Sequence, residues 1–197
     1  MNILHVVSSP RKESYSHRLG NGIIEKLQAA NPGSTVQVRN LAEHPFPHLE
    51  EANIQSFQSP AEGRTPEQQQ AARNSDEVIA EVQAADTIII DAPFYNFSIP
   101  STLKAWIDHL ARAGVTFRYT AAGPEGLVTG KKVYVALASG GVYSSGPAAG
   151  YDFAAPYLKA VLGFLGMTDV TVARAEGLAV PELQPTALQK GLDSVSV

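Results

Sequence analysis

Residues 87–110 read TIIIDAPFYNFSIPSTLKAWIDHL, and the prediction of the fold starts from this stretch. Thr87–Ile90 is a short apolar run between two aspartates, which is typical of a strand covered on both faces of a parallel sheet. The segment Pro100–Ala113 predicts a helix, because its large apolar residues recur with the spacing of one helix face: Leu103, Trp106, Ile107 and Leu110. A buried strand followed by a loop and an amphipathic helix is the repeating unit of α/β proteins.

The same alternation runs through the rest of the chain. Four other short apolar runs predict strands: Ile3–Val7, Thr35–Val38, Lys132–Leu137 and Val170–Val172. Four other segments carry helical patterns: Ser16–Ala30, Pro66–Ala84, Phe153–Leu165 and Pro181–Val195. We therefore expect a single flavodoxin-like α/β domain over residues 1–197. It should have a five-stranded parallel sheet in the order 2-1-3-4-5 and helices on both faces.

Two long segments interrupt this alternation. Leu41–Arg64 is polar and contains three prolines, and Gly114–Gly130 is rich in glycine. We expect both to form long loops, which in compact domains are usually functional or mobile. His44 and His48 lie four residues apart, but the prolines beside them prevent a shared helix face, so no metal site is expected.

The composition excludes several classes of function. With 44% hydrophobic and 17% charged residues, the chain should be an ordinary globular protein. The net charge is −4 and basic residues do not cluster, so no nucleic-acid partner is expected. The N-terminal apolar run is too short for a signal peptide or a membrane span, so we expect a cytoplasmic protein without a membrane partner. Because the chain has no cysteine, redox chemistry would need a bound cofactor.

Ligands bind open parallel sheets beyond the carboxyl ends of the strands, where three loops of this chain are expected. The phosphate loop, Ser8–His17, leads from the first strand into the first helix and contains four serines. Hydroxyl groups, backbone amides and a helix N-terminus together favour a phosphate dianion. The alternative is a polar turn in which Ser16 only caps the helix. No G-x-G-x-x-G pattern is present here, which argues against a dinucleotide at this loop.

The other two loops follow the third and fourth strands. The aromatic loop, Ala92–Ser101, has three aromatic residues in four positions, which suit a planar heterocycle. The glycine loop, Ala138–Tyr143, contains paired glycines that let backbone amides approach a ligand closely. Each pattern alone has a structural alternative, as the edge of the core or as a tight turn. Together, at one edge of one sheet, the three loops match a molecule with a phosphate at one end and a tricyclic ring at the other.

Segments spread along nearly the whole chain carry a resemblance: Ser9–Arg11, Ser14–Ser16, Ala92–Phe97, Leu103–Lys104, Ala111–Thr120, Gly123–Lys132, Tyr157–Leu158, Gly163–Gly166 and Ala175–Gly177. On these segments the sequence resembles the FMN-dependent NADH-azoreductase family, relatives of the NAD(P)H–quinone reductases. The run Phe117–Lys132 is very specific. In the glycine loop the family often reads Ser-Arg-Gly-Gly, whereas this chain reads Ala-Ser-Gly-Gly, which leaves coenzyme preference and acceptor range open.

The resemblance implies that the chain binds FMN non-covalently. The FMN phosphate would be held by hydroxyls and amides of the phosphate loop: Ser9, Ser14, Tyr15 and Ser16. The isoalloxazine would be lined by the aromatic loop: Phe94, Tyr95, Asn96 and Phe97. The pyrimidine end would meet the glycine loop: Ala138, Ser139, Gly140 and Gly141. Tyr119 would help to form the wall of the substrate pocket.

The implied activity is that of an FMN-dependent NADH:quinone oxidoreductase, or NADH-azoreductase, with NADH or NADPH as the electron donor. Small aromatic acceptors, quinones and azo compounds, would be reduced by ping-pong hydride transfer through flavin N5. No side chain is expected to be catalytic, because the flavin performs the chemistry. Family members are homodimers with the site at the subunit interface. The residues alone leave two alternatives, a non-enzymatic flavodoxin-like electron carrier and a phosphate-binding regulator without turnover.

Overall fold

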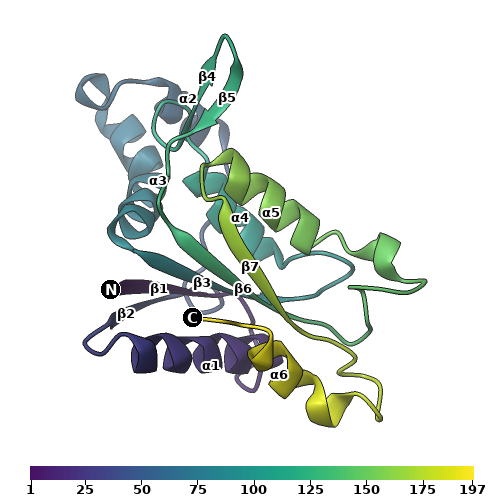
Figure 1. The fold of residues 1–197 in the computed structure, drawn as a ribbon. Coiled ribbons are helices and arrows are strands. Elements are labelled where there is room, and N and C mark those ends of the chain that lie inside the picture. Colours follow the sequence, from purple (N-terminus) through teal and green to yellow (C-terminus); the bar gives the residue numbers. More distant parts are fainter.

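A five-stranded parallel sheet forms the centre of the protein, which a computed structural model describes over residues 1–197 (Figure 1). Its strands are β1 (Asn2–Val7), β2 (Thr35–Asn40), β3 (Thr87–Pro93), β6 (Lys132–Ala138) and β7 (Asp169–Ala175). They lie in the order β2-β1-β3-β6-β7, and every neighbouring pair is parallel. Counted along the chain within this sheet, the order is 2-1-3-4-5, which confirms the predicted flavodoxin-like fold.

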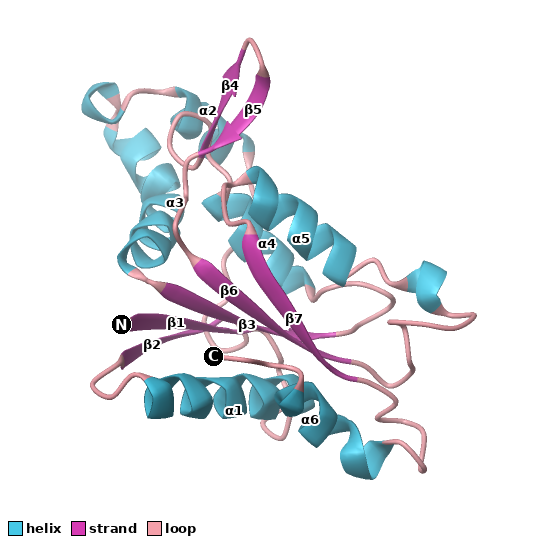
Figure 2. Cartoon of the chain, in the orientation of Figure 1, coloured by secondary structure: helices cyan, strands magenta, loops and turns pink.

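Helices cover both faces of the sheet (Figure 2). On one face lie α1 (Tyr15–Ala30) and α6 (Gln184–Asp193). On the other face lie α3 (Pro66–Ala84), α4 (Ser101–Leu110) and α5 (Ala155–Phe164). None of these helices combines the length and the apolar character that crossing a membrane requires. Because helices pack on both faces of the sheet, the protein has two separate apolar cores, one on each face.

β3 contributes to both cores, because successive side chains of a strand point to opposite faces. Ile88 and Ile90 belong to the larger core, which is filled by α3, α4 and α5. Ile89 belongs to the smaller core, which is filled by α1. All seven residues of β3 are buried, as expected for a strand covered on both sides.

β3 is longer than its apolar run predicts. The predicted strand ends at Ile90, but the pairing with β6 continues until Pro93 lies opposite Ala138. Asp91 is consequently a residue inside the sheet rather than the residue that ends the strand. The first residues of the predicted aromatic loop, Ala92 and Pro93, are also part of the strand.

The predicted helix starts are correct to within a few residues. α3 begins as expected, with Thr65 as its N-cap and Pro66 at its first position, and the hydroxyl of Thr65 accepts the amide of Gln68 at 3.3 Å. α5 begins at Ala155, after a 3-10 turn over Ala149–Tyr151.

The first of the two long predicted loops contains a helix, so that prediction was wrong. Within residues 41–64, α2 (Glu51–Gln58) packs against α3, and a 3-10 turn spans Ala61–Gly63. The sequence pattern conceals α2 because the residues that it buries are polar, Asn53 and Ser56. A helix without an apolar stripe gives no hydrophobic periodicity to detect.

The second predicted loop contains a β-hairpin, so the prediction was wrong there as well. β4 (Phe117–Thr120) and β5 (Gly123–Gly126) pair in antiparallel fashion and project from the body of the molecule (Figure 1). Arg118 and Glu125 lie opposite each other and form a bidentate ion pair, with N–O distances of 2.8 and 3.0 Å. The strands are short and mostly exposed, so they lack the alternation that identifies a half-buried strand.

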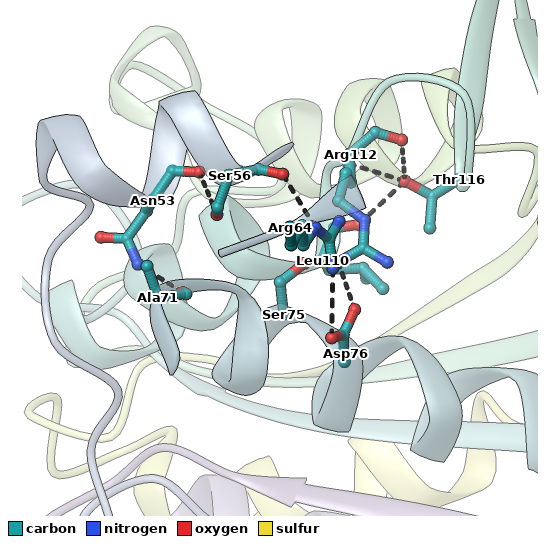
Figure 3. A network of polar contacts seen from close by, with 9 residues as sticks. All are labelled: Asn53, Ser56, Arg64, Ala71, Ser75, Asp76, Leu110, Arg112 and Thr116. Atoms are coloured by element: carbon teal, nitrogen blue, oxygen red, sulfur yellow. Dashed lines mark hydrogen bonds and ion pairs between the residues drawn. The ribbon is translucent and has the colours of Figure 1, made fainter. Parts of the chain in front are cut away.

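A polar network connects the end of α2 and the segment between α4 and the hairpin to α3 (Figure 3). The buried side chain of Arg112 donates from Nη1 to Oδ1 of Asp76 at 2.5 Å and to Oγ of Ser75 at 3.2 Å. Arg64 donates from Nε to the carbonyl oxygen of Ser56 at 3.1 Å, and its Nη1 lies 3.5 Å from Oδ2 of Asp76. One carboxylate therefore balances two guanidinium groups and joins the end of α2 and the segment after α4 to α3.

Candidate functional site

A cavity of about 500 Å³ lies at the edge where the parallel strands end. The three predicted loops and a fourth segment after β7 form its wall: Arg11, Ser14, Tyr15, Pro93, Phe94, Tyr95, Ala138, Ser139, Gly140, Leu178, Ala179 and Gln184. The loops converge because neighbouring parallel strands have their carboxyl ends at the same edge. The volume is in the range of small-molecule and cofactor sites.

The N-terminus of α1 supplies one end of this cavity. The first backbone hydrogen bond of the helix runs from the amide of Arg18 to the carbonyl oxygen of Ser14 at 3.0 Å, so the amides of residues 15–17 have no partner in the protein. Ser14 is the N-cap residue, yet its hydroxyl does not cap the helix and instead pairs with the hydroxyl of Ser16 at 2.8 Å. Buried hydroxyls beside free amides and a positive helix end form a site for an anion.

The aromatic loop turns sharply at Asn96 and Phe97. Tyr95 and Ser98 bind each other through both backbone groups, at 2.9 and 3.0 Å, and enclose a two-residue turn. Both central residues have positive φ, 48° for Asn96 and 70° for Phe97. Asparagine tolerates this conformation, but a bulky residue such as phenylalanine rarely adopts it. Phe97 is therefore held in a strained backbone conformation, and the residue is 46% exposed.

Aromatic rings from three loops gather around this turn. Phe94 and Tyr143 lie 4.4 Å apart between ring centroids, and Tyr143 lies 6.3 Å from Phe97. Tyr151, in the 3-10 turn before α5, lies 5.4 Å from Phe97. Of the aromatic loop, Phe94 and Tyr95 line the 500 Å³ cavity, and they give it aromatic surface that suits a planar ligand.

Hydrogen bonds with the segment after β7 hold the glycine loop in place. The amides of Gly177, Leu178 and Ala179 donate to carbonyl oxygens of the loop, at distances from 2.9 to 3.1 Å. The carboxylate of Glu176 accepts the amides of Tyr143 and Ser144, each at 2.9 Å. The loop is therefore a rigid floor rather than a free tight turn.

A second cavity, of about 680 Å³, lies on the other side of the aromatic turn. Tyr95 lines both cavities, and Asn96 lines the second. Tyr157 also contributes, and burial, assisted by the charge of Asp108, raises the pKa of its hydroxyl to about 12. This hydroxyl therefore stays protonated at neutral pH and can act as a hydrogen-bond donor.

Comparison with known proteins agrees with the fold described above. Residues 1–196 match a family described by its flavodoxin-like fold. The chain belongs to this family. An FMN-dependent NADH:quinone oxidoreductase 1 of Rhizobium etli is 53% identical over 191 residues, which are 97% of this chain and 92% of the relative. An FMN-dependent NADH:quinone oxidoreductase of Rhizobium leguminosarum bv. trifolii is 50% identical and covers 100% of this chain and 95% of its own.

Solved structures agree with the sequence relatives of this flavodoxin-like protein. An azoreductase from Bacillus anthracis superposes with a TM-score of 0.90 at 31% identity and covers 98% of this chain and 95% of its own. An FMN-dependent NADH-azoreductase from Bacillus anthracis, solved in complex with FMN, superposes with a TM-score of 0.84 at 28% identity, with 98% and 97% covered. The predicted resemblance to the FMN-dependent azoreductases is thereby confirmed.

The fold of this flavodoxin-like protein brings most of the predicted site residues together. Seven of them line the 500 Å³ cavity: Ser14, Tyr15, Phe94, Tyr95, Ala138, Ser139 and Gly140. Ser9 and Ser16 are buried in the phosphate loop, and Asn96 and Phe97 form the strained turn. A Cβ atom on Gly141 would lie 3.1 Å from the Tyr143 ring.

Tyr119 is the predicted residue that lies elsewhere. It is on β4, is 75% exposed and lines neither cavity. The hairpin that carries it projects away from the carboxyl ends of β3 and β6 (Figure 1).

Several residues at the site were given no role from the sequence. Leu178 and Ala179 reach the cavity through backbone bonds to the glycine loop, which no local pattern reveals. Glu176 lies in the segment Ala175–Gly177 that carries the resemblance, and its place directly after a strand could have suggested that it holds a loop. His5 and Asp91 could have been noticed as ionisable residues within strands that are otherwise apolar.

Proposed function

We propose that this protein binds FMN non-covalently at the 500 Å³ cavity and catalyses the reduction of quinones and azo compounds by NADH. The observation that carries the proposal is one cavity with free amides of α1 at one end and an aromatic wall over a glycine floor at the other. A phosphate group and a planar ring require these two environments. The names of relatives that match almost the whole chain support the enzyme over the electron carrier.

In this proposal the phosphate loop holds the phosphate. The amides of Tyr15 and Ser16 and the hydroxyls of Ser9, Ser14 and Ser16 donate to it, and about four such charge-assisted bonds would anchor it firmly. Tyr15 is itself held by Gln184, whose Nε2 donates to the phenol oxygen at 2.8 Å.

The aromatic and glycine loops hold the ring system. Phe94 supplies flat apolar surface in the cavity, and the Phe97 ring stands nearly perpendicular to it, with 6.5 Å between the ring centroids. Tyr95 and Asn96 border the side that faces the second cavity. The backbone of residues 138–141 approaches the pyrimidine end. When bound, the flavin would supply the redox chemistry, and we expect hydride transfer through its N5 in a ping-pong order. The protein orients the reactants and excludes water.

NADH is the donor in the names of the relatives, and we keep NADPH as an additional candidate donor.

We also propose a homodimer with its sites at the interface. Tyr119 is 75% exposed on a projecting hairpin and lines neither of these cavities of its own chain, so it is free to contact the cavity of a second copy. The cytoplasmic location stays a prediction.

Flavin binding and reduction test the proposal directly. Binding to the protein should quench the fluorescence of FMN. Addition of NADH without oxygen should then bleach the bound flavin rapidly. Ser14→Ala and Ser16→Ala together should weaken FMN binding by about tenfold or more, because two hydrogen bonds to a charged group are lost. Ser34→Ala, in the turn beyond the other end of α1, is the matched control. A protein that leaves flavin fluorescence unchanged would contradict the proposal, and bound flavin that stays yellow with NADH would favour the electron carrier.

A further inference from the structure

A carboxylate is completely buried beneath the phosphate loop. Asp91 of β3 is 0% exposed, and its neighbours in the sheet, Val7 and Ala136, are apolar. α1 passes directly over it, so closely that a Cβ atom on Gly20 would lie 2.0 Å from Oδ1 of Asp91. A buried charge is costly unless another group compensates it, so this position needs a cation or a proton.

Two imidazoles supply the compensation from one side. Nε2 of His5 lies 2.9 Å and Nδ1 of His17 lies 3.0 Å from the same oxygen, Oδ2 of Asp91. The two rings are stacked, with centroids 5.4 Å apart. The other carboxylate oxygen, Oδ1, has no partner. His5 is buried, whereas the side chain of His17 is 35% exposed and can exchange protons with the solvent.

The cluster is connected to the phosphate loop at two points. His17 is the third residue of α1, and its backbone amide is one of the three free amides at the helix N-terminus. Ser8, the first residue of the phosphate loop, donates from its hydroxyl to the carbonyl oxygen of Asp91 at 2.5 Å. Asp91 therefore contacts the start of the loop through its backbone and the first turn of α1 through its carboxylate.

We propose that Asp91 is a positioning residue that keeps His17 as an imidazolium in the first turn of α1, where this cation strengthens the binding of the phosphate group of FMN. The proposal rests on the proposed function, because it concerns the same cofactor. A cation at a helix N-terminus opposes the helix dipole, so it requires a counter-charge such as Asp91. The hydrogen bond to Asp91 is the main cause that raises the pKa of His17, against the opposing effect of burial.

The sign of the effect follows from the charges. His5 contacts the same oxygen in either case, so the charge of the cluster beneath the phosphate becomes one unit more negative when His17 loses its proton. FMN affinity should therefore be high below the pKa of His17 and should fall as the pH rises through it. On the faces that meet the cluster, β1 contributes His5, β3 contributes Asp91 and α1 contributes His17. The other ionisable residues of this region, Arg11, Lys12, Glu13 and Arg18, form no hydrogen bond or ion pair with it.

The test compares FMN with riboflavin, which lacks the phosphate. Dissociation constants for both flavins are measured by fluorescence quenching from about pH 6.5 to about pH 9, with EDTA present. The variant is His17→Asn, whose amide can still donate to Asp91 but carries no charge. Ionisation of the FMN phosphate occurs equally with both proteins, so the difference between them isolates His17. Asp91→Asn is the second variant, because it keeps an acceptor for the rings but removes the carboxylate charge.

We expect the wild type to bind FMN about three- to tenfold more tightly than His17→Asn at the lower pH, with the difference vanishing at the upper pH. Riboflavin should bind both proteins equally at every pH. Equal FMN affinities of the wild type and His17→Asn across the range would overturn the inference, as would an equal pH dependence for riboflavin. If neither flavin binds at all, it is the proposed function that fails. Should Asp91→Asn not fold, His17→Asn still decides, because its side chain is partly exposed.

Discussion

Gly20 has no side chain, and this leaves room for the cluster of His5, His17 and Asp91 between α1 and the sheet. Ala at position 20 would bring a Cβ atom to 2.0 Å from Oδ1 of Asp91 and 3.0 Å from Nε2 of His5, and α1 and β3 would have to separate. We expect Gly20→Ala to lower the free energy of unfolding by about 1–3 kcal/mol, as overpacking of a tight interface does. Urea denaturation followed by circular dichroism measures this change.

The matched control for this prediction is Gly163→Ala. Gly163 is also helical, and a Cβ atom there would meet nothing within 4 Å. Because alanine has a better helix propensity than glycine, this variant should be neutral or slightly more stable. A Gly20→Ala protein as stable as Gly163→Ala would show that α1 can shift away from Asp91 at little cost.

At Phe97 the backbone strain and the ring contact can be separated by two substitutions. Glycine removes the ring and relieves the positive φ, whereas alanine removes the ring but keeps the strain. Phe97→Gly should therefore be more stable than Phe97→Ala by about 1 kcal/mol in thermal or urea unfolding. Both should weaken FMN binding to a similar extent, because both lose the ring. Equal stabilities would mean that the turn relaxes when the ring is absent.

Elements that bury apolar residues were predictable, and those that bury polar residues were not. Ile88, Ile89 and Ile90 identified β3 because a run of three isoleucines has no stable place on a surface. α2 was missed because the residues that it buries, Asn53 and Ser56, are polar. Their hydrogen bonds are completed by groups outside the helix: Asn53 donates to the carbonyl oxygen of Ala71 in α3, and the carbonyl oxygen of Ser56 accepts from Arg64. Sequence periodicity records hydrophobicity, and it does not record which distant group will complete a hydrogen bond.

The link between α2, α3 and the segment after α4 is also testable. Asp76→Ala would leave the guanidinium of Arg112, which is 7% exposed, without its carboxylate partner. Because the Asp76 side chain is itself half-exposed, we expect a loss of stability of only about 1–2 kcal/mol. Asp108→Ala breaks the exposed pair with Lys104 and should cost a few tenths of a kcal/mol, about what one such helical pair contributes. Equal effects in urea unfolding would mean that the buried network does not stabilise the fold.

At the scale of the whole molecule, the topology of the sheet made the position of the site predictable. It did not predict which residues reach the site from the segment after β7, or what Tyr119 contacts. The phosphate, aromatic and glycine loops could be assigned to one site because parallel strands bring their carboxyl ends together. Leu178 and Ala179 could not be assigned, since their approach depends on how β7 leaves the sheet. Tyr119 lines no cavity of its own chain, which is the reason to consider a second copy.

A mixed dimer tests whether Tyr119 acts across the interface. Light scattering should first give twice the mass of one chain, and Tyr119→Ala alone should raise KM for a quinone about three- to tenfold through the loss of an aromatic contact. A Tyr119→Ala chain is then paired with a chain carrying Ser14→Ala and Ser16→Ala, at an FMN concentration that fills only the cofactor site without these two substitutions. If Tyr119 serves the partner's site, the intact cofactor site of the first chain receives the ring of the second, and this dimer keeps the wild-type KM at about half the activity. If Tyr119 serves its own chain, the mixed dimer shows the raised KM, because its one working site then lacks the ring.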